Sequence, residues 1–483
     1  MSVLDAHVET VEHLQPMQVV GRVRALRGLT LLVRDLPMPV GSLVAIGGDG
    51  LAAGVRYSTS NVRHRLGEII GFDGSHAIVM MLAGTGGVRS GDAVVGLHAQ
   101  PTVGVGWSML GRVVDGLGRP IDGAGPLHAL TPRPLDPEPI SAMRRTRITR
   151  ALTTGVRSMD LMTTLGRGQR LGIFAGPGVG KSTLLGQIAR GTAADVSVVA
   201  LIGERGREVK DFIEHTLGEE GRKKCVLVVA TSDESALLRV RAAHVACSVA
   251  EYFRDQGRSV MLLMDSITRF AHAQRQIGLS VGEPPATRGY TPSVFAAMAR
   301  MLERAGAIAP QTSVTPPPSS LRSDTSPARA GEGGSITGLY SILVEGDDMT
   351  EPVADAARGI LDGHVILSRK LAQRGHYPAI DVLDSISRVA DDVCDEAHVH
   401  ARRQVIRLLA AHREAEDLIQ IGAYAKGSSP VTDVAIKYHD RLIELLQQGS
   451  RETEPFEVSR TRMVKLAIEA GAEFQRLAKG GKQ

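Results

Sequence analysis

A glycine-rich run, AGPGVGKST at 175–183, carries the strongest chemical signal in the sequence. It follows the apolar run LGIF and precedes the helical pattern LLGQIAR. In a loop between a strand and a helix, glycines let backbone N–H groups close around phosphates. Ala175 departs from the glycine of the strict pattern, but the strand–loop–helix context is retained. We therefore predict a nucleotide site rather than an ordinary glycine-rich turn.

Each polar residue of this run has a predicted role. The Lys181 ammonium would reach the β- and γ-phosphates, and the Ser182 hydroxyl would ligate Mg²⁺. The residues predicted to bind the nucleotide here are Gly176, Pro177, Gly178, Val179, Gly180, Lys181, Ser182 and Thr183.

Two other strand-like runs lead into acidic residues. SVMLLMD ends at Asp265, which could hold Mg²⁺ through water, although buried strands also end in Asp as a turn or cap residue. Because a glycine-rich loop lies upstream, we favour the metal-binding role of Asp265 over the turn or cap role. VSVVALIG leads into Glu204, Arg205 and Glu208, and a carboxylate there could orient an attacking water. From spacing alone, a solvated charged turn explains this second group equally well.

The elements that must position these groups form an alternating pattern. From about residue 100, strand-like runs alternate with helical patterns, and most runs are apolar throughout, as expected for strands buried on both faces. We predict an α/β core with a parallel sheet, in which ligands bind beyond the carboxyl ends of the strands. The strand candidates are RLGIFAG, VSVVALIG, CVLVVATS, SVMLLMD, SITGLYSILV, HVILS and PAIDVL.

Different patterns flank this core. Short β-type runs from Met17 to Leu97, with a hairpin turn at Asp73–Gly74, predict a small β-barrel. After about residue 390 the pattern is helical, and Ser429–Pro430 places an N-cap residue before a proline suited to a first helical position. The predicted segments are an amphipathic stretch at 1–16, a barrel at 17–99, a nucleotide-binding core at 100–390 and a helical domain at 391–483.

Two segments stand apart from these domains. Residues 1–16 predict a short amphipathic helix that could bind a partner's surface or pack on the chain's own barrel. Its apolar face comprises Leu4, Val8, Val11 and Leu14. The segment 307–334 is rich in Pro, Ser and Thr, which predicts a flexible surface loop. Because it connects a helix to a strand, we expect it at the amino-terminal edge of the sheet, away from the ligand edge.

Composition narrows the functional class. The chain has 483 residues, of which 43% are hydrophobic and 22% charged, as in soluble globular proteins. The sequence shows no bilayer-spanning apolar stretch and no apolar signal core, and its three cysteines fit neither a disulfide framework nor a zinc site. We therefore expect a cytoplasmic protein. A net charge of +4 and an aromatic content of 3% disfavour nucleic-acid binding.

Taken together, the motifs resemble the catalytic-subunit family of rotary ATP synthases, and most closely the export ATPases of flagellar and type III secretion systems. The resemblance rests on GVGKST, LIGERGREV, MLLMDSITRF, GSITGLYSILVEGDD and GHVILSRK. PAIDVLDSIS at 378–387 matches the signature of that superfamily at every position. The resemblance implies that the core at 100–390 is a RecA-like P-loop ATPase domain. The resemblance covers nearly the whole chain after residue 17, whereas the segment 307–334 has no counterpart in the family.

The resemblance implies roles for the acidic group. Glu204 matches the catalytic glutamate that polarises water, and Arg205 and Glu208 match its supporting neighbours. Asp265 matches the aspartate on the magnesium side of the site. We accordingly expect Ser182, Asp265 and Glu208 on the metal side, and Glu204 with Lys181 at the reacting phosphate.

Two further residues acquire roles in the same way. Arg388, in SISRV, matches the arginine finger that reaches a neighbouring subunit's γ-phosphate, and we expect it near the ligand edge of the sheet because it follows the strand PAIDVL. Tyr377 matches the aromatic residue that stacks on adenine, with a buried core tyrosine as the alternative.

The function that the resemblance implies is Mg²⁺-dependent ATP hydrolysis that energises protein export, carried out by a homohexamer. Expected partners are a stator-like regulator, the export gate, chaperones and secreted proteins, at the cytoplasmic face of the membrane and without nucleic acid. The stretch GAYAKGSSP at 422–430 favours the flagellar branch over the virulence branch. Two further classes of protein stay open, a hexameric RNA translocase and a scaffold that binds nucleotide without hydrolysing it.

Overall fold

The computed structural model describes residues 19–47, 65–309, 333–344, 346 and 348–480. The predicted helix at 1–16 and most of the segment 307–334 lie outside the described residues. The chain divides into two compact units. The first comprises the residues up to Thr102 together with 234–238 and 273–292, and the second comprises the remainder.

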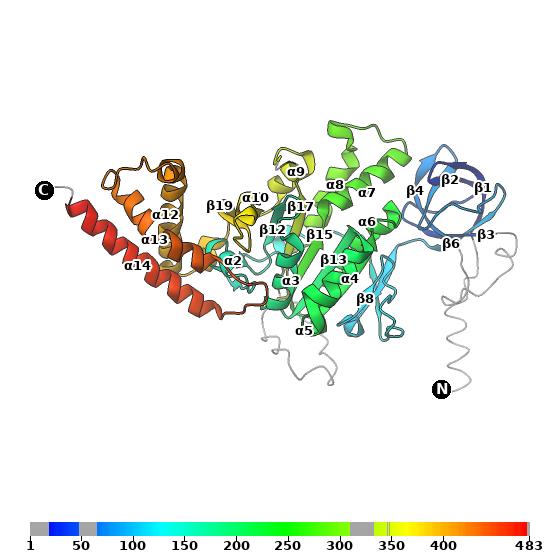
Figure 1. Cartoon of the computed structure of the whole chain (residues 1–483). Helices are drawn as coiled ribbons and strands as arrows, with labels where there is room; N and C mark the ends of the chain where they lie inside the picture. Colours follow the sequence, from blue (N-terminus) through cyan, green and yellow to red (C-terminus); the bar gives the residue numbers. More distant parts are fainter. Residues whose placement is uncertain (1–18, 48–64, 310–332, 345, 347, 481–483) are drawn as a thin grey trace. The chain divides into compact units, whose positions relative to one another are not determined.

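The first unit contains a closed antiparallel barrel with the strand order β1-β2-β5-β4-β3-β6, as the sequence predicts (Figure 1). Its interior is filled by aliphatic side chains such as Val33, Val44 and Ile69, which are fully buried. The predicted hairpin turn joins β4 to β5, where Asp73 pairs with His76 and Gly74 has a φ of +58°. The strands are β1 (Val20–Arg27), β2 (Thr30–Arg34), β3 (Leu43–Gly47), β4 (Arg65–Asp73), β5 (His76–Met81) and β6 (Ala93–His98).

The second unit is built on a sheet with the order β19-β18-β12-β17-β15-β13-β14-β8. Its strands are parallel from β18 to β8, whereas β19 runs antiparallel to β18, and β16 pairs antiparallel with β17. The strands are β8 (Val113–Val114), β12 (Arg170–Ala175), β13 (Val196–Glu204), β14 (Cys225–Thr231), β15 (Ser259–Asp265), β16 (Gly306–Ala307), β17 (Ser335–Leu343), β18 (Gly363–Leu367) and β19 (Ile380–Ser387).

Helices between these strands complete the predicted α/β core. Those of the core region are α2 (Arg157–Met162), α3 (Lys181–Gly191), α4 (Gly206–Asp211), α5 (Gly218–Lys223), α6 (Ala236–Asp255), α7 (Ile267–Ser280), α8 (Pro292–Leu302), α9 (Pro352–Ile360), α10 (Arg369–Gln373) and α11 (Ala390–Val393). A π-helix, Phe212–Leu217, continues α4. Shorter strands are β7 (Thr102–Val105), β9 (Thr131–Pro134), β10 (Ala151–Leu152) and β11 (Leu165–Gly166).

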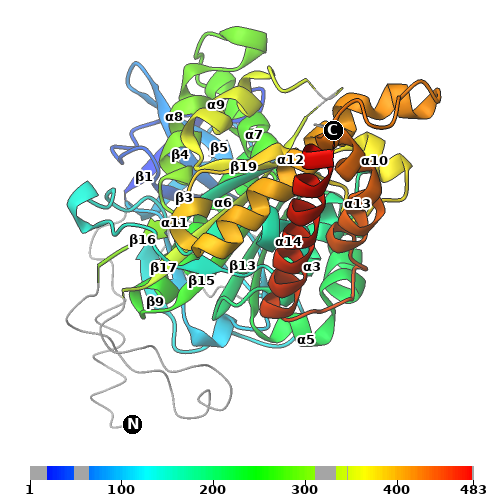
Figure 2. The ribbon, with the colours of Figure 1, turned by 90° about the vertical axis from the view of Figure 1, so that its left-hand side faces the viewer.

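The helices α12 (Glu396–Gln420), α13 (Pro430–Leu446) and α14 (Phe456–Gly480) lie side by side after the core (Figures 1 and 2). One continuous apolar core joins them to the sheet, so that Val405, Leu442 and Met463 belong to the same buried cluster as Ile173. The predicted cap of α13 is present, because the Ser429 hydroxyl accepts a hydrogen bond from the backbone N–H of Thr432 at 3.3 Å.

The described ends of the segment 307–334 lie where the topology predicts. Ala307 pairs with Ser335 at the first residue of β17, and Ser335 pairs with Ser259 at the first residue of β15. Both ends are therefore at the amino-terminal edge of the parallel strands. Ala307 itself belongs to β16, so the connection begins after the predicted first residue.

Candidate active site

The glycine-rich loop joins β12 to α3, as predicted. Gly178 and Gly180 have φ values of +77° and +91°, a region that only glycine occupies without strain. Gly180 is the N-cap of α3, whose first N–H groups have no partner within the helix and can meet a phosphate. Ser182 and Thr183 are exposed beside this helix end, whereas the Val179 side chain packs into the core and leaves only its backbone to the loop.

Two acidic residues from neighbouring strands meet the lysine of this loop. The Lys181 ammonium pairs with the Asp265 carboxylate and lies 3.7 Å from the Glu204 Oε1 atom. Glu204 ends β13 and Asp265 ends β15, so the carboxyl edge of the sheet brings both to Lys181. The three side chains are largely buried, which strengthens the interaction between their charges.

Two residues that the sequence analysis did not identify complete this cluster. The Ser341 hydroxyl of β17 donates to Asp265 Oδ1 at 2.6 Å, and Arg269 Nε of α7 donates to Glu204 Oε1 at 3.2 Å. Ser341 is a polar residue inside the apolar run SITGLYSILV, and its polarity could have marked it as a candidate site residue. The Arg269 contact depends on how α7 leaves β15, and its sequence position carries no comparable signal.

Burial raises the pKa of Glu204, and the neighbouring Asp265 carboxylate raises it further, while Lys181 and Arg269 oppose the rise. A hydrogen bond with Glu208 adds to the increase in the pKa of Glu204. A carboxylate whose pKa lies above its ordinary value is a better proton acceptor at neutral pH, which suits a group that activates water. Because Glu204 is buried, it does not belong to a solvated charged turn, which was the alternative interpretation.

Arg205 and Glu208 are placed differently from Glu204. They form an ion pair of 3.2 Å at the start of α4, and their side chains are 77% and 49% exposed. Among the described residues, no three His, Cys, Asp or Glu side chains form a group that could hold a metal ion. Ser182 and Asp265 still fit a nucleotide-bound Mg²⁺, because that ion usually takes one or two protein oxygens and fills its other positions with phosphate and water.

A cavity of about 310 Å³ adjoins the glycine-rich loop. Val179, Gly180 and Thr183 line one side, and Tyr377 with its neighbour Pro378 lines another. Tyr377 is 47% exposed, so it is not the buried core tyrosine of the alternative interpretation. Residues 448–450, in the connection between α13 and α14, form a further wall that the sequence analysis did not anticipate.

The expected position of Arg388 near the ligand edge is wrong. β19 runs antiparallel to β18, so Ser387, the last residue of β19, pairs with Gly363, the first residue of β18. The Arg388 N–H donates to the Asp362 carbonyl at 3.0 Å, and Asp362 also accepts a hydrogen bond from the Arg170 N–H at the start of β12. Lys181 follows the opposite end of that strand, about 20 Å away at a rise of about 3.3 Å per residue. Arg388 therefore cannot reach the phosphates of its own chain.

Comparison with known proteins places the chain in one family. The model of the ATP synthase alpha/beta family nucleotide-binding domain matches residues 155–387, and that of the type III secretion EscN ATPase C-terminal domain matches residues 394–465. The flagellum-specific ATP synthase of Treponema pallidum is 48% identical over 92% of each chain. The type 3 secretion system ATPase of Pseudomonas syringae pv. syringae is 41% identical over 96% of this chain and 97% of its own.

The chain belongs to the family of flagellar and type III secretion ATPases. Among solved structures of this family, the assembled ATPase EscN from enteropathogenic E. coli superimposes with a TM-score of 0.79 at 37% identity, covering 92% of this chain and all of that one. Membership confirms the predicted resemblance, fold class and enzyme class, an ATPase. Among the described residues, no helix is both long and apolar enough to cross a membrane.

Proposed function

We propose that this chain hydrolyses Mg²⁺-bound ATP to energise protein export through a flagellar-type secretion apparatus. The observation that carries the proposal is the meeting of Lys181, Glu204 and Asp265 beside the glycine-rich loop. A cation for the phosphates, a carboxylate for water and a carboxylate for the metal are the parts that phosphoryl transfer to water requires.

The residues divide the reaction between them. The backbone of 176–180 and the Lys181 ammonium hold the β- and γ-phosphates, and Tyr377 stacks on the adenine. Ser182, Asp265 and Glu208 would hold Mg²⁺, which would neutralise charge on the phosphate oxygens. Glu204 orients the water whose oxygen bonds to the γ-phosphorus while the bond to the β–γ bridging oxygen breaks, giving ADP and phosphate. Glu208 also raises the pKa of Glu204, and Arg205 pairs with Glu208.

A ring-shaped homo-oligomer, a homohexamer, is part of the proposal. Arg388 is exposed at the edge opposite its own glycine-rich loop, so only a neighbouring subunit's site is available to it as an arginine finger. EscN, the structural relative, is described as an assembled ATPase, and a second structure holds it in complex with its central stalk EscO. We propose a stator-like regulator, export-gate components, chaperones and secreted proteins as partners, at the cytoplasmic face of the membrane and without nucleic acid.

The flagellar assignment rests on GAYAKGSSP at 422–430 and on flagellum-specific relatives that include one at 48% identity. Secretion-system ATPases are similar at 41% to 45% identity, so a virulence-type export ATPase is the second candidate. Deleting the gene in its own cells distinguishes the two, because loss of flagellar filaments supports the first and loss of secreted effectors with intact filaments supports the second.

The direct test of the enzymatic proposal is Glu204→Gln. The amide keeps the size of the side chain but cannot accept a proton, so ATP binding should remain while turnover falls by about 10²–10⁴-fold. The matched control is Glu214→Gln, which changes an exposed glutamate paired with Lys210 and should leave the rate unchanged. Turnover of Glu204→Gln within a few-fold of the wild-type rate would remove Glu204 from the mechanism.

A further inference from the structure

The connection between α13 and α14, residues 447–455, forms a wall of the cavity beside the glycine-rich loop; we name it the 447–455 loop. Gln448 and Gly449 line that cavity together with Tyr377. The backbone N–H of Gln448 donates to the Tyr377 carbonyl at 2.9 Å. The loop thus touches both the proposed base-binding space and the residue proposed to stack on the base.

The helix that follows the glycine-rich loop also holds this wall. Arg190 Nη2 of α3 donates to the Ser450 carbonyl at 2.6 Å, and the Gln187 amide donates to the Gly449 carbonyl at 3.4 Å. The backbone of the 447–455 loop is therefore tied to the same helix that begins at Lys181.

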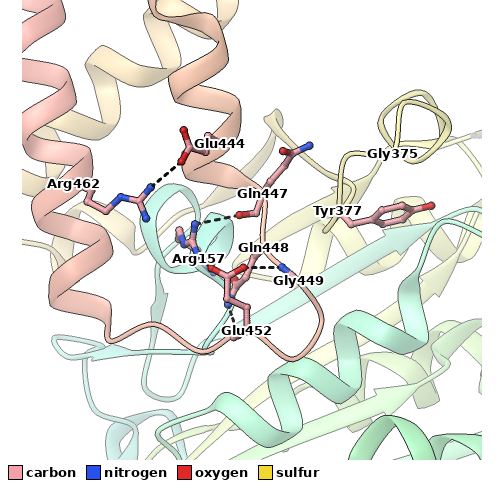
Figure 3. Close-up of a pocket in the computed structure, with 9 residues that line it drawn as sticks. All are labelled: Arg157, Gly375, Tyr377, Glu444, Gln447, Gln448, Gly449, Glu452 and Arg462. Atoms are coloured by element: carbon pink, nitrogen blue, oxygen red, sulfur yellow. Dashed lines mark hydrogen bonds and ion pairs between the residues drawn. The ribbon is translucent and has the colours of Figure 1, made fainter.

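On its other side the 447–455 loop is contacted by Arg157, at the first residue of α2 (Figure 3). Glu454 of the loop also pairs with Arg462 of α14 at 3.2 Å. The Arg157 side chain is only 5% exposed. Its Nη1 donates to the Gln447 carbonyl at 3.2 Å, its Nη2 pairs with Glu452, and its Nε lies 3.2 Å from Glu454 Oε2. A planar guanidinium suits this task because it can meet several acceptors at fixed angles.

These contacts continue from Arg157 to the cavity wall. The second carboxylate oxygen of Glu452 accepts a hydrogen bond from the Gly449 N–H at 2.9 Å. The Gln448 amide donates to the Gly155 and Glu452 carbonyls at 3.0 and 2.9 Å, and its oxygen accepts from the Arg157 N–H at 2.7 Å. Figure 3 shows Arg157, Gln448 and Glu452 turned toward one another. Arg157 and Glu452 do not line the cavity beside the glycine-rich loop, but they line a neighbouring pocket of about 490 Å³ together with Tyr377, Gln448 and Gly449.

We propose that Arg157 is a positioning residue for the base of ATP, which holds the 447–455 loop as a ready-made wall and, through Gln448, keeps Tyr377 in place. The inference rests on the proposed function, since it requires ATP in the cavity. A loop already held in its binding conformation does not lose conformational freedom when the base arrives, and this raises affinity without a new contact to the ligand.

The test compares two ligands on the full-length protein by titration calorimetry: ATP and inorganic tripolyphosphate, which carries the phosphates but no base. Arg157→Gln should weaken ATP binding about tenfold, a typical value for a disturbed base-stacking contact, and change tripolyphosphate binding by less than about twofold. In steady-state assays the KM for ATP should rise while kcat stays within about twofold, as expected for uniform binding. Arg157→Lys should recover only part of the affinity, because an ammonium cannot reproduce the fork.

The matched control is Arg460→Gln. Arg460 is an arginine of α14 that pairs with Asp395 and Glu457 and makes no contact with the 447–455 loop among the described interactions. The Arg460→Gln variant should bind ATP and tripolyphosphate with unchanged affinity. Should Arg157→Gln fail to fold, Glu452→Gln removes the same ion pair from its other partner, whose side chain is 46% exposed. This variant should weaken the binding of ATP but not that of tripolyphosphate.

Equal weakening of ATP and tripolyphosphate would show a general disturbance of the site and would overturn the proposal, as would unchanged ATP affinity in the folded variants. If the wild-type chain binds neither ATP nor tripolyphosphate, the proposed function fails. A failure of the Arg157 proposal alone would instead leave the wild-type chain able to bind both.

Discussion

Lys181 is the residue on which the electrostatics of the site depend. Its ammonium is the cation that pairs with Asp265 and stands 3.7 Å from Glu204, two carboxylates that otherwise repel one another in a buried setting. The rise in the pKa of Glu204 reflects this balance, because burial and Asp265 raise the pKa and Lys181 and Arg269 lower it. The lysine that we propose to bind the phosphates therefore also influences the ionisation of the proposed general base.

Lys181→Ala should abolish hydrolysis, by about 10³-fold or more, and weaken ATP binding, because a fixed positive charge on the β- and γ-phosphates is lost. Turnover by a coupled phosphate-release assay and binding by calorimetry measure the two effects. Lys210→Ala is the control, since Lys210 is exposed and pairs only loosely with Glu214 at 3.8 Å. A folded Lys181→Ala protein with normal turnover would refute the phosphate-binding role.

At the scale of elements, α13 begins at a defined cap. The Ser429 hydroxyl accepts a hydrogen bond from the Thr432 N–H, and Pro430 occupies the first helical turn, where no N–H is needed. Ser429→Ala should lower the free energy of unfolding by about 1 kcal/mol, measured by urea denaturation. Ser428→Ala, at the exposed neighbour outside the cap, should have no measurable effect; equal effects of the two substitutions would argue against the cap.

The connection between β16 and β17 belongs to the same scale. Its described ends, Ala307 and Ser335, lie at the edge of the sheet opposite the carboxyl ends of β13 and β15. Replacing residues 311–331 by a short Gly–Ser linker should leave ATPase activity within about twofold of wild type, as is common for surface connections. A large loss of turnover with unchanged circular dichroism would show that this segment acts on the ring or on the site.

For the whole molecule, the antiparallel direction of β19 separates Arg388 from its own site by about the length of a strand of six residues. Arg388→Ala should therefore bind ATP and assemble but hydrolyse about 10³–10⁵-fold more slowly, since an arginine finger offsets charge that develops only in the transition state. Mixing it with Lys181→Ala subunits should restore part of the activity, because some sites then combine an intact loop with a neighbour's intact arginine.

The mixing experiment has a clear negative outcome. Mixed rings, verified by tagging each variant differently, that show no activity at any ratio would count against an arginine acting between subunits. Arg403→Ala serves as the control, because Arg403 is an exposed arginine of α12 that pairs with Asp391.

Features that depend on local physics could be predicted from the order of the amino acids. The loop at Gly178 and Gly180 could be recognised because positive φ values favour glycine. The start of α13 could be recognised from the capping chemistry of Ser429–Pro430, and the buried strands from runs of apolar residues. The placement of Glu204 and Asp265 beside Lys181 was predictable because the carboxyl ends of parallel strands share one edge of a sheet.

The direction of β19, the burial of Glu204 and the exposure of Tyr377 became known from the folded chain. It alone brought Arg157 and Gln448, far apart in the chain, into one hydrogen-bonded group. The reason is that a strand's direction and a loop's partners depend on contacts between residues distant in sequence, whose pairing no local pattern of residue types records. Arg388 shows the consequence: its motif was recognisable, but its side of the sheet depended on whether β19 ran parallel or antiparallel to β18.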